Sequence, residues 1–275
     1  MILFKGESMF LNLRKGLFVF FIMSLFCFSI YASDTKKSSV TPKVLSGRDV
    51  MKGVYEHAKF HKTQKSEIMM VIEDKKRKKG KRTRHFILSK KHKPEETRSL
   101  IKFFKPANIK GTSLLTHADE ESDEKLQWIY FPSFKSVKKL SSKQKHDSFM
   151  GSDFTYSDIG GRQLDQDEHV LVKQDKDYFY LKSTPKDKDD HYLHLVAVIS
   201  KKEQVARKIV FYNRKKEKLK TLYNKTVKNI KGGHLVFYSK MVNHLTGSET
   251  HLNVKKMDVG VKLDDAYLGM QGLQD

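Results

Sequence analysis

The sequence is almost without cysteine. Of its 275 residues only Cys27 is a cysteine, and it lies inside the single long apolar run, residues 17–31. Lipid attachment to a cysteine needs a small residue just before it, and Phe26 stands there. If this N-terminal segment is removed, no cysteine is left. A disulfide framework and thiol chemistry are therefore excluded for the rest of the chain.

Acidic residues are also scarce. The chain has 32 Asp and Glu against 54 Lys and Arg, which gives a formal net charge of +22. Such a balance favours an anionic partner, which could be nucleic acid, an acidic membrane surface or an anionic lipid. Hydrophobic residues make up 38% and aromatic residues 11% of the chain, enough to build a core. A disordered basic tail would be poorer in both, so that class is excluded for the chain as a whole.

The N-terminus has the pattern of a secretory signal peptide. Lys5, Arg14 and Lys15 precede the apolar run, and Ala32 stands before a polar stretch. We expect cleavage after Ala32, with either Met1 or Met9 as the true start. The alternative is an uncleaved anchor, although the run is about 15 residues long and a spanning helix needs about 20. Export makes nucleic acid an improbable partner and places the protein in the periplasm of a Gram-negative-type envelope.

The few Pro and Gly residues form no linker, and no repeat of fixed period occurs. We therefore predict a signal peptide over residues 1–32, a flexible leader over 33–45 and one domain over 46–275. Ser46 can cap an amphipathic helix that runs to about Lys62. From residue 64 onward the pattern changes to short strands joined by polar turns. We expect them at 67–72, 83–88, 98–104, 126–131, 169–173, 178–182, 192–200, 206–213, 219–226, 235–242 and 250–257. This pattern predicts a mainly β protein with a meandering antiparallel sheet.

Motifs for catalysis or metal binding are weak or missing. Gly151-Ser152-Asp153 lacks the G-x-S-x-G pattern of a nucleophile turn. His57 and His61 lie one helical turn apart but have no evident third ligand. We therefore predict no catalytic residue, no metal and no cofactor. Within the same region, Ser152 or Asp153 is expected to cap a short helix.

Three segments resemble a known family. They are KPANIKGT at residues 105–112 followed by Leu114-Leu115, WIYFPSFKSVKKL at 128–140, and SFMGSDFTYSDI at 148–159. In these segments the chain resembles the periplasmic outer-membrane lipoprotein-sorting proteins of the LolA-like superfamily. The resemblance extends from about residue 47 to residue 261, and the element at 149–156 is its most specific part.

The resemblance implies an open, strongly curved antiparallel sheet, a partial β-barrel, with helices on its concave face. It also implies a non-enzymatic carrier that binds lipid or lipoprotein acyl chains in an apolar cavity and moves them across the periplasm. The alternative that it implies is a periplasmic partner of a resistance-nodulation-type, lipid-exporting envelope transporter. Lipid or lipoprotein acyl chains, an envelope transporter or outer-membrane receptor, and an anionic membrane surface are the expected partners.

Two sets of residues are candidate sites. Large apolar side chains in or near the recognised segments could line the cavity: Met70, Trp128, Tyr130, Phe134, Phe149, Met150, Phe154 and Tyr156. Ordinary core packing is the alternative for each of them. A basic run in the turn of a predicted hairpin could dock on anionic headgroups or on a partner: Lys75, Lys76, Arg77, Lys78 and Lys79. The alternative for this run is a solvated turn.

Overall fold

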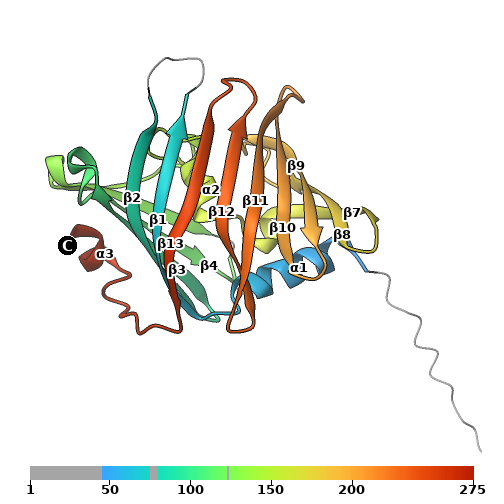
Figure 1. The fold of residues 1–275 in the computed structure, drawn as a ribbon, viewed down its shortest axis with the longest axis horizontal. Helices are drawn as coiled ribbons and strands as arrows, with labels where there is room; N and C mark the ends of the chain where they lie inside the picture. Colours follow the sequence, from blue (N-terminus) through green and yellow to red (C-terminus); the bar gives the residue numbers. More distant parts are fainter. Residues whose placement is uncertain (1–44, 75–79, 123) are drawn as a thin grey trace, which may run out of the picture. The chain divides into compact units, whose positions relative to one another are not determined.

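A computed structural model describes residues 45–74, 80–122 and 124–275 (Figure 1). The expected signal peptide and all but the last residue of the expected leader lie outside this part of the chain. Within the described ranges, no helix is both long enough and apolar enough to cross a membrane. The helices and strands are α1 (Gly47–Ala58), β1 (Thr63–Glu73), β2 (Arg82–His92), β3 (Glu96–Lys105), β4 (Ser113–Asp119), β5 (Lys125–Phe131), β6 (Ser136–Lys139), α2 (Tyr156–Gly160), β7 (Asp167–Gln174), β8 (Tyr178–Pro185), β9 (Tyr192–Ser200), β10 (Val205–Asn213), β11 (Lys218–Ile230), β12 (Gly233–Asn243), β13 (Glu249–Val259) and α3 (Met270–Gln274).

The strands form one antiparallel sheet of 13 strands. Its order is β6-β5-β4-β3-β2-β1-β13-β12-β11-β10-β9-β8-β7. Every pair is a sequence neighbour except β1 with β13, which joins a wing built from β1–β6 to a wing built from β7–β13. The sheet curves but does not close, because β6 and β7 are its two edges (Figure 1). The predicted open, curved antiparallel sheet is confirmed.

The eleven strands expected from the sequence are all present, and two more were missed. In β4 the four residues from Ser113 to Thr116 are all buried, because both faces of the sheet are covered there. Such a strand shows no alternation of apolar and polar residues, so the period-2 signal fails. The other missed strand, β6, has only four residues.

One face of the sheet, called here the inner face, carries the main core. Ile68, Met70 and Ile72 of β1 pack there with Phe86 of β2 and Met241 of β12. Helix α1 lies on the same face and packs Val50 against Leu181, Ala197 and Ile199. The predicted position of a helix on the concave face is therefore correct for α1.

The opposite, outer face is covered at β3–β5 by the C-terminal segment, residues 260–275. Leu268 and Leu273 of this segment are fully buried against Leu100 and Leu115. The side chain of Lys91 fastens the segment further, with its ammonium 2.8 Å from the Asp265 carboxylate. Coverage of both faces explains why β4 is apolar on both sides.

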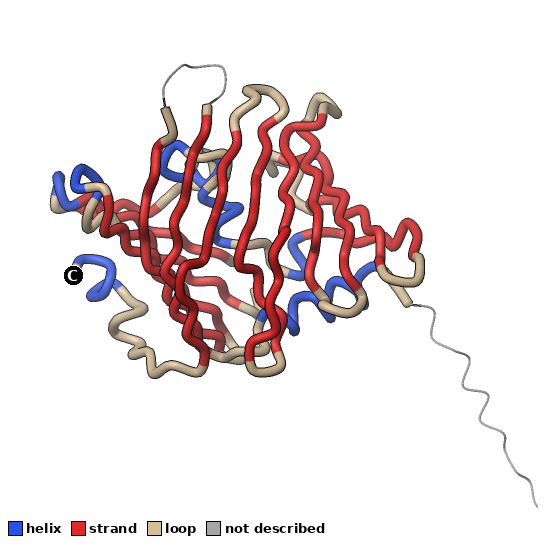
Figure 2. Tube along the Cα trace, viewed as in Figure 1, coloured by secondary structure: helices blue, strands red, loops and turns tan. Residues whose placement is uncertain are grey.

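Residues 140–166 join the two edges of the sheet and are called here the crossing segment. The segment runs across the inner face, where Phe149 and Phe154 join the main core (Figure 2). It contains short 3₁₀ turns and helix α2. Thr155, rather than the expected Ser152 or Asp153, caps α2, and Thr155 and Asp158 form a capping box. Asp153 instead accepts hydrogen bonds from the Thr250 and Ser248 hydroxyls, which fix it to β13 and the turn before it.

Helix α1 begins as expected and ends early. Ser46 caps it in a capping box with Asp49. The helix ends at Ala58 and not near Lys62. The following turn packs under the β11–β12 hairpin, where His61 Nε2 lies 2.9 Å from the Ile230 carbonyl oxygen.

Candidate functional site

A cavity of about 310 Å³ lies between helix α1, the crossing segment and the inner face of the β7–β13 wing. Most of the side chains around it are apolar. The apolar lining consists of Met51, Val54, Ala58, Phe154, Leu164, Leu195, Ala197, Ala206, Ile209, Phe211, Leu222 and Met241. The cavity therefore presents mainly apolar surface, as most pockets for small ligands do.

Two periodicities aim these side chains into the cavity. Met51, Val54 and Ala58 follow one another at helical spacing, so they share one face of α1. Leu195 and Ala197 alternate along β9, and alternate residues of a strand point to the same face. The helix and the strands thus present two apolar surfaces to each other across the cavity.

The charged side chains at the cavity wall are already paired. Arg162 donates two hydrogen bonds to the Asp167 carboxylate, at 2.8 and 2.5 Å, and a third to Asp190 at 2.9 Å. Burial would lower the pKa of Arg162, but the two carboxylates outweigh burial and raise it. The Arg162 guanidinium therefore stays charged, with its donors directed at the carboxylates.

A second buried ion pair lies beneath the crossing segment. The Lys220 ammonium is 2.5 Å from Asp158 Oδ2, and the Tyr192 hydroxyl donates to Asp158 Oδ1 at 2.8 Å. Burial alone would raise the pKa of Asp158. The ammonium of Lys220 and the hydrogen bonds from Lys220, Thr155 and Tyr192 together lower it. The same burial, followed by the Asp158 charge, raises the pKa of Tyr192 well above its usual value.

A further polar side chain at the wall, His169, is also hydrogen-bonded. The ring of His169 lies 2.8 Å from the Leu164 carbonyl through Nε2 and 2.8 Å from the Ser183 hydroxyl through Nδ1. Because the charged side chains at the wall are paired, the cavity presents mainly apolar surface. Gln163 is the exception among the polar wall residues, since its buried Oε1 has no hydrogen-bond partner among the described residues. A charged headgroup would have to break an existing pair to enter.

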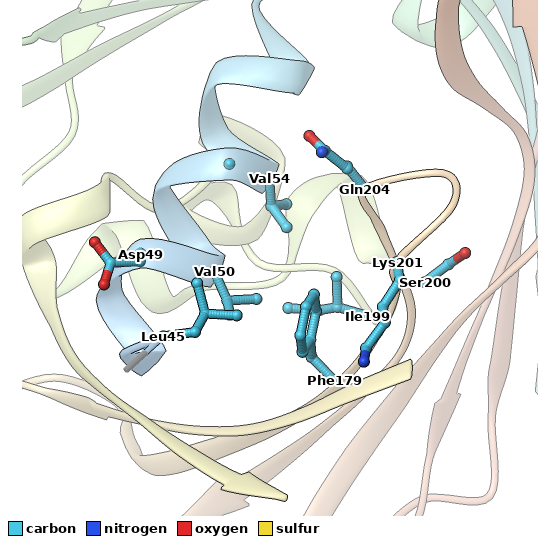
Figure 3. A pocket seen from close by; sticks show the side chains of 10 residues that line it. Leu45, Asp49, Val50, Val54, Phe179, Ile199, Ser200, Lys201 and Gln204 are labelled. Carbon is cyan, nitrogen blue, oxygen red and sulfur yellow. The ribbon is translucent and has the colours of Figure 1, made fainter. Parts of the chain in front are cut away.

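A second, smaller pocket lies at the start of α1. It has a volume of about 200 Å³. Figure 3 shows Val50 and Val54 of the helix facing Phe179 and Ile199 of the sheet, with Asp49 directed away from them. Lys201 and Gln204 stand at its polar rim. Val54 contributes to both pockets, so the helix separates this surface depression from the cavity.

The structure disperses the eight predicted cavity residues. Phe154 lines the cavity. Met70 and Phe149 are fully buried in the adjoining inner-face core, and Met150 and Tyr156 pack against it. The Phe149 ring contacts the ring of Phe103 at 5.7 Å and that of Tyr156 at 5.5 Å.

Three of the eight lie elsewhere. Trp128 and Tyr130 pack on the outer face, in the cluster formed by the C-terminal segment. Their neighbours Ile129 and Phe131 face inward, because successive residues of a strand point to opposite sides. Phe134 is 76% exposed, in a turn at the end of β5. The structure therefore does not bring these three side chains to the cavity.

The basic run and the histidine pair are the other sequence features considered as sites. The basic run from Lys75 to Lys79 lies outside the described residues, so its docking role stays a prediction. His57 Nε2 accepts a hydrogen bond from the backbone N–H of His234 at 3.0 Å, which binds the helix to β12. Among the described residues, no group of three or more His, Cys, Asp or Glu side chains is arranged to hold a metal.

Sequence reasoning missed most of the lining. The side chains from α1 and from β9–β12 lie outside the three recognised segments and were not among the predicted cavity residues. The helical stripe of α1 was a visible signal, whereas apolar and polar residues do not alternate regularly in β9 and β10. A stripe does not indicate which buried side chains border an empty volume.

Comparisons with known proteins agree with the fold. A family model described as an uncharacterized protein matches residues 95–275. A DUF1329 family protein from Desulfovibrio piger is similar at 25% identity and a TM-score of 0.77, over 82% of this chain and 97% of that one. A domain designated as an outer-membrane lipoprotein-sorting protein, from Vibrio parahaemolyticus, is similar at 26% identity and a TM-score of 0.78, over 83% of this chain and 98% of that one.

A more distant likeness supports the fold alone. A LolA superfamily protein from Nitrosomonas europaea is 16% identical, with a TM-score of 0.66, over 83% of this chain and 100% of that one. No curated protein matches the sequence. The family model spans more than half of the chain. The protein is therefore a member of that family, and its fold is similar to that of the lipoprotein-sorting protein domain and of the LolA superfamily protein.

Proposed function

We propose that the protein is a non-enzymatic periplasmic carrier that holds the acyl chains of a lipid or lipoprotein in the cavity between α1, the crossing segment and the sheet. The observation that supports this best is the nature of the cavity wall. Its side chains are mainly apolar, and its charged groups are paired with each other. The signal-peptide pattern at residues 1–32 supports export.

The physical basis is burial of hydrocarbon. Each methylene moved from water into an apolar cavity contributes roughly 0.8 kcal/mol, so binding needs no catalytic group. Met51 and Met241 at the wall have unbranched, adaptable side chains, which suit acyl chains of differing shape. A headgroup would remain at the mouth, because the buried ion pairs leave no free charge to receive it.

The alternative is a periplasmic partner of a resistance-nodulation-type transporter that uses the same fold without cargo. The resemblance in the recognised segments supports both readings. Lipid content separates them, because a carrier retains or takes up acyl chains and a cargo-free partner does not.

The test combines lipid analysis with a cavity-filling variant. We expect mass spectrometry of the purified protein to detect acyl lipids, and the delipidated protein to take up a fluorescent fatty acid. Ala197 lies at the cavity wall and is 7% exposed, so Ala197→Phe should lower this uptake at least tenfold by occupying the volume. Ala266→Phe, at an exposed position in the C-terminal segment, is the matched control and should leave uptake unchanged.

Denaturant unfolding curves of both variants show whether each one is folded, so that uptake is compared only between folded proteins. Protein that repeatedly carries no lipid and takes up no fatty acid would contradict the carrier and favour the transporter partner. Equal uptake by Ala197→Phe and wild type would place the binding site elsewhere.

A further inference from the structure

Phe134 is the most exposed large hydrophobic side chain among the described residues, at 76%. It belongs to the 3₁₀ turn Pro132–Phe134 that follows β5, at the β6 edge of the sheet. The Phe131 ring meets the Phe134 ring edge to face, with centroids 6.4 Å apart. Phe134 is thus held at the surface by a packed neighbour and is not part of the cavity lining.

The turn that carries Phe134 is rigidly built. Pro132 begins it, and Lys135 ends it in the left-handed conformation, with φ of 46°. A second 3₁₀ turn, Ala107–Ile109, lies against it, since a Cβ atom added to Gly111 would be 2.9 Å from Pro132 Cγ. The two turns and their flanking lysines are called here the basic tip. In Figure 2 the two small helical turns lie together at one edge of the sheet.

Charge of one sign surrounds Phe134. Residues 97–118 and 125–146, which contain nearly all of β3–β6, hold ten Lys and Arg and no Asp or Glu. Five lysines at or next to the basic tip are exposed: Lys105, Lys110, Lys135, Lys138 and Lys139. None of these five lysines forms an ion pair with a carboxylate of the described residues.

This combination matches the chemistry of an anionic bilayer surface. Ammonium groups on long flexible stems attract a fluid layer of phosphates, and an aromatic ring is stable at the boundary between headgroups and acyl chains. A protein groove would normally bury a cluster of large apolar side chains. The basic tip offers one such exposed ring among dispersed charges, which favours the membrane.

We propose that the basic tip docks the protein on anionic membranes, with Phe134 inserted among the headgroups and the lysines around it bound to lipid phosphates. This surface shares no residue with the cavity lining or with the basic run Lys75–Lys79. It would hold the β6 edge against the bilayer independently of cargo.

The test is binding of the purified protein to vesicles of phosphatidylglycerol or of phosphatidylcholine at low salt. We expect the protein to bind phosphatidylglycerol vesicles but not phosphatidylcholine vesicles, and we expect added salt to weaken this binding. Phe134→Ala should lower the partition coefficient about tenfold, and Lys105→Gln/Lys110→Gln/Lys135→Gln about a hundredfold. Val172→Ala, which changes a 62% exposed residue on the opposite edge strand β7, is the matched control and should have no effect.

A spectroscopic arm reports where contact occurs. Trp128 is the single tryptophan and is packed beneath the C-terminal segment, so Phe134→Trp adds a surface reporter. The emission of this variant should shift to shorter wavelength on phosphatidylglycerol vesicles, also when Lys75–Lys79 are neutralised. The proposal is overturned if the wild type does not bind, if Phe134→Ala binds as well as Val172→Ala, or if the emission of Phe134→Trp stays unchanged on bound vesicles.

Discussion

Gly47 illustrates how one residue protects a sheet edge. It is buried in the first turn of α1, where a Cβ atom would lie 2.5 Å from the His169 carbonyl oxygen and 2.6 Å from the Leu171 backbone nitrogen. Both atoms belong to the edge strand β7. An uncovered edge is prone to pair with another chain. The helix thus approaches the β7 backbone more closely than any residue with a side chain would permit.

Replacing Gly47 by Ala should therefore destabilise the protein by about 1–3 kcal/mol, because the helix must move away from β7. Gly53→Ala in the same helix is the matched control. The added Cβ would lie 3.8 Å from the nearest atom, so this substitution should stabilise the protein by about 0.5–1 kcal/mol through the higher helix propensity of Ala. Urea unfolding of both variants measures the difference. Equal effects of the two changes would show that the close approach is unimportant.

At the scale of elements, the crossing segment forms one side of the cavity wall. Several contacts fasten it to the sheet. Gln127 of β5 donates to the Tyr156 carbonyl at 3.0 Å, Lys125 to the Gly161 carbonyl, and Lys220 of β11 binds Asp158. The first two contacts reach the β1–β6 wing and the third reaches the β7–β13 wing. The segment therefore spans both wings from the inside.

Lys220→Met should destabilise the protein by about 3–5 kcal/mol, because it leaves the Asp158 carboxylate buried without its cation. Adding Asp158→Asn removes that charge and should restore part of the loss. Denaturant unfolding of wild type, both single variants and the double variant gives the coupling energy. Additive losses would show that the ion pair does not act as a unit.

At the scale of the whole molecule, the end of α1 connects the two wings. The helix packs on strands of the β7–β13 wing, while Tyr55 donates to Glu120 at 2.7 Å and the Lys59 ammonium lies 2.6 Å from the same carboxylate, just after β4. His92 of β2 lies in this group. Burial, followed by the positive charges of Lys90 and Lys59, lowers the pKa of His92 from 6.5 to about 3.

This lowered pKa predicts a loss of stability in acid. The folded protein keeps His92 neutral down to about pH 3, whereas the unfolded chain protonates it below about 6.5. The unfolded state thus binds more protons within this window, and the free energy of unfolding decreases as the pH falls through it. In the middle of this pH window, His92→Asn should reduce the slope of the free energy of unfolding against pH by up to about 1.4 kcal/mol per pH unit.

Denaturant unfolding at several pH values between 3 and 7 measures both slopes. The acidic residues are common to the two proteins, so the difference between the slopes isolates His92. Parallel curves for wild type and His92→Asn would contradict the assignment.

Much of the architecture followed from local patterns in the chain. The capping residue Ser46, the stripe of α1, the alternation in β13 and the polar turns between short strands predicted the elements and the antiparallel sheet. Local patterns failed where a residue is buried on both faces, as at Leu114 and Leu115 of β4. They failed again at Lys59, where packing of the following turn against β11 and β12 ends the helix.

The candidate site was less predictable. Phe149, Phe154 and Phe134 lie in two neighbouring recognised segments, and their sequence contexts do not distinguish them. Tertiary structure gives them three environments: the inner-face core, the cavity wall and the exposed basic tip. Trp128 and Ile129 are adjacent yet face opposite sides. Sequence spacing specifies which residues share a face, but not what covers that face.

The sequence alone therefore determined the class of the molecule: a basic, mainly β chain with one cysteine and an antiparallel meander of the LolA-like type. These properties follow from composition and local periodicity, which act over a few residues. The tertiary structure decided the cavity, its paired charges and the exposed position of Phe134. These depend on contacts between residues far apart in the chain, such as α1 with β9 or Lys220 with Asp158, because an empty volume or an exposed surface exists only once the elements have packed.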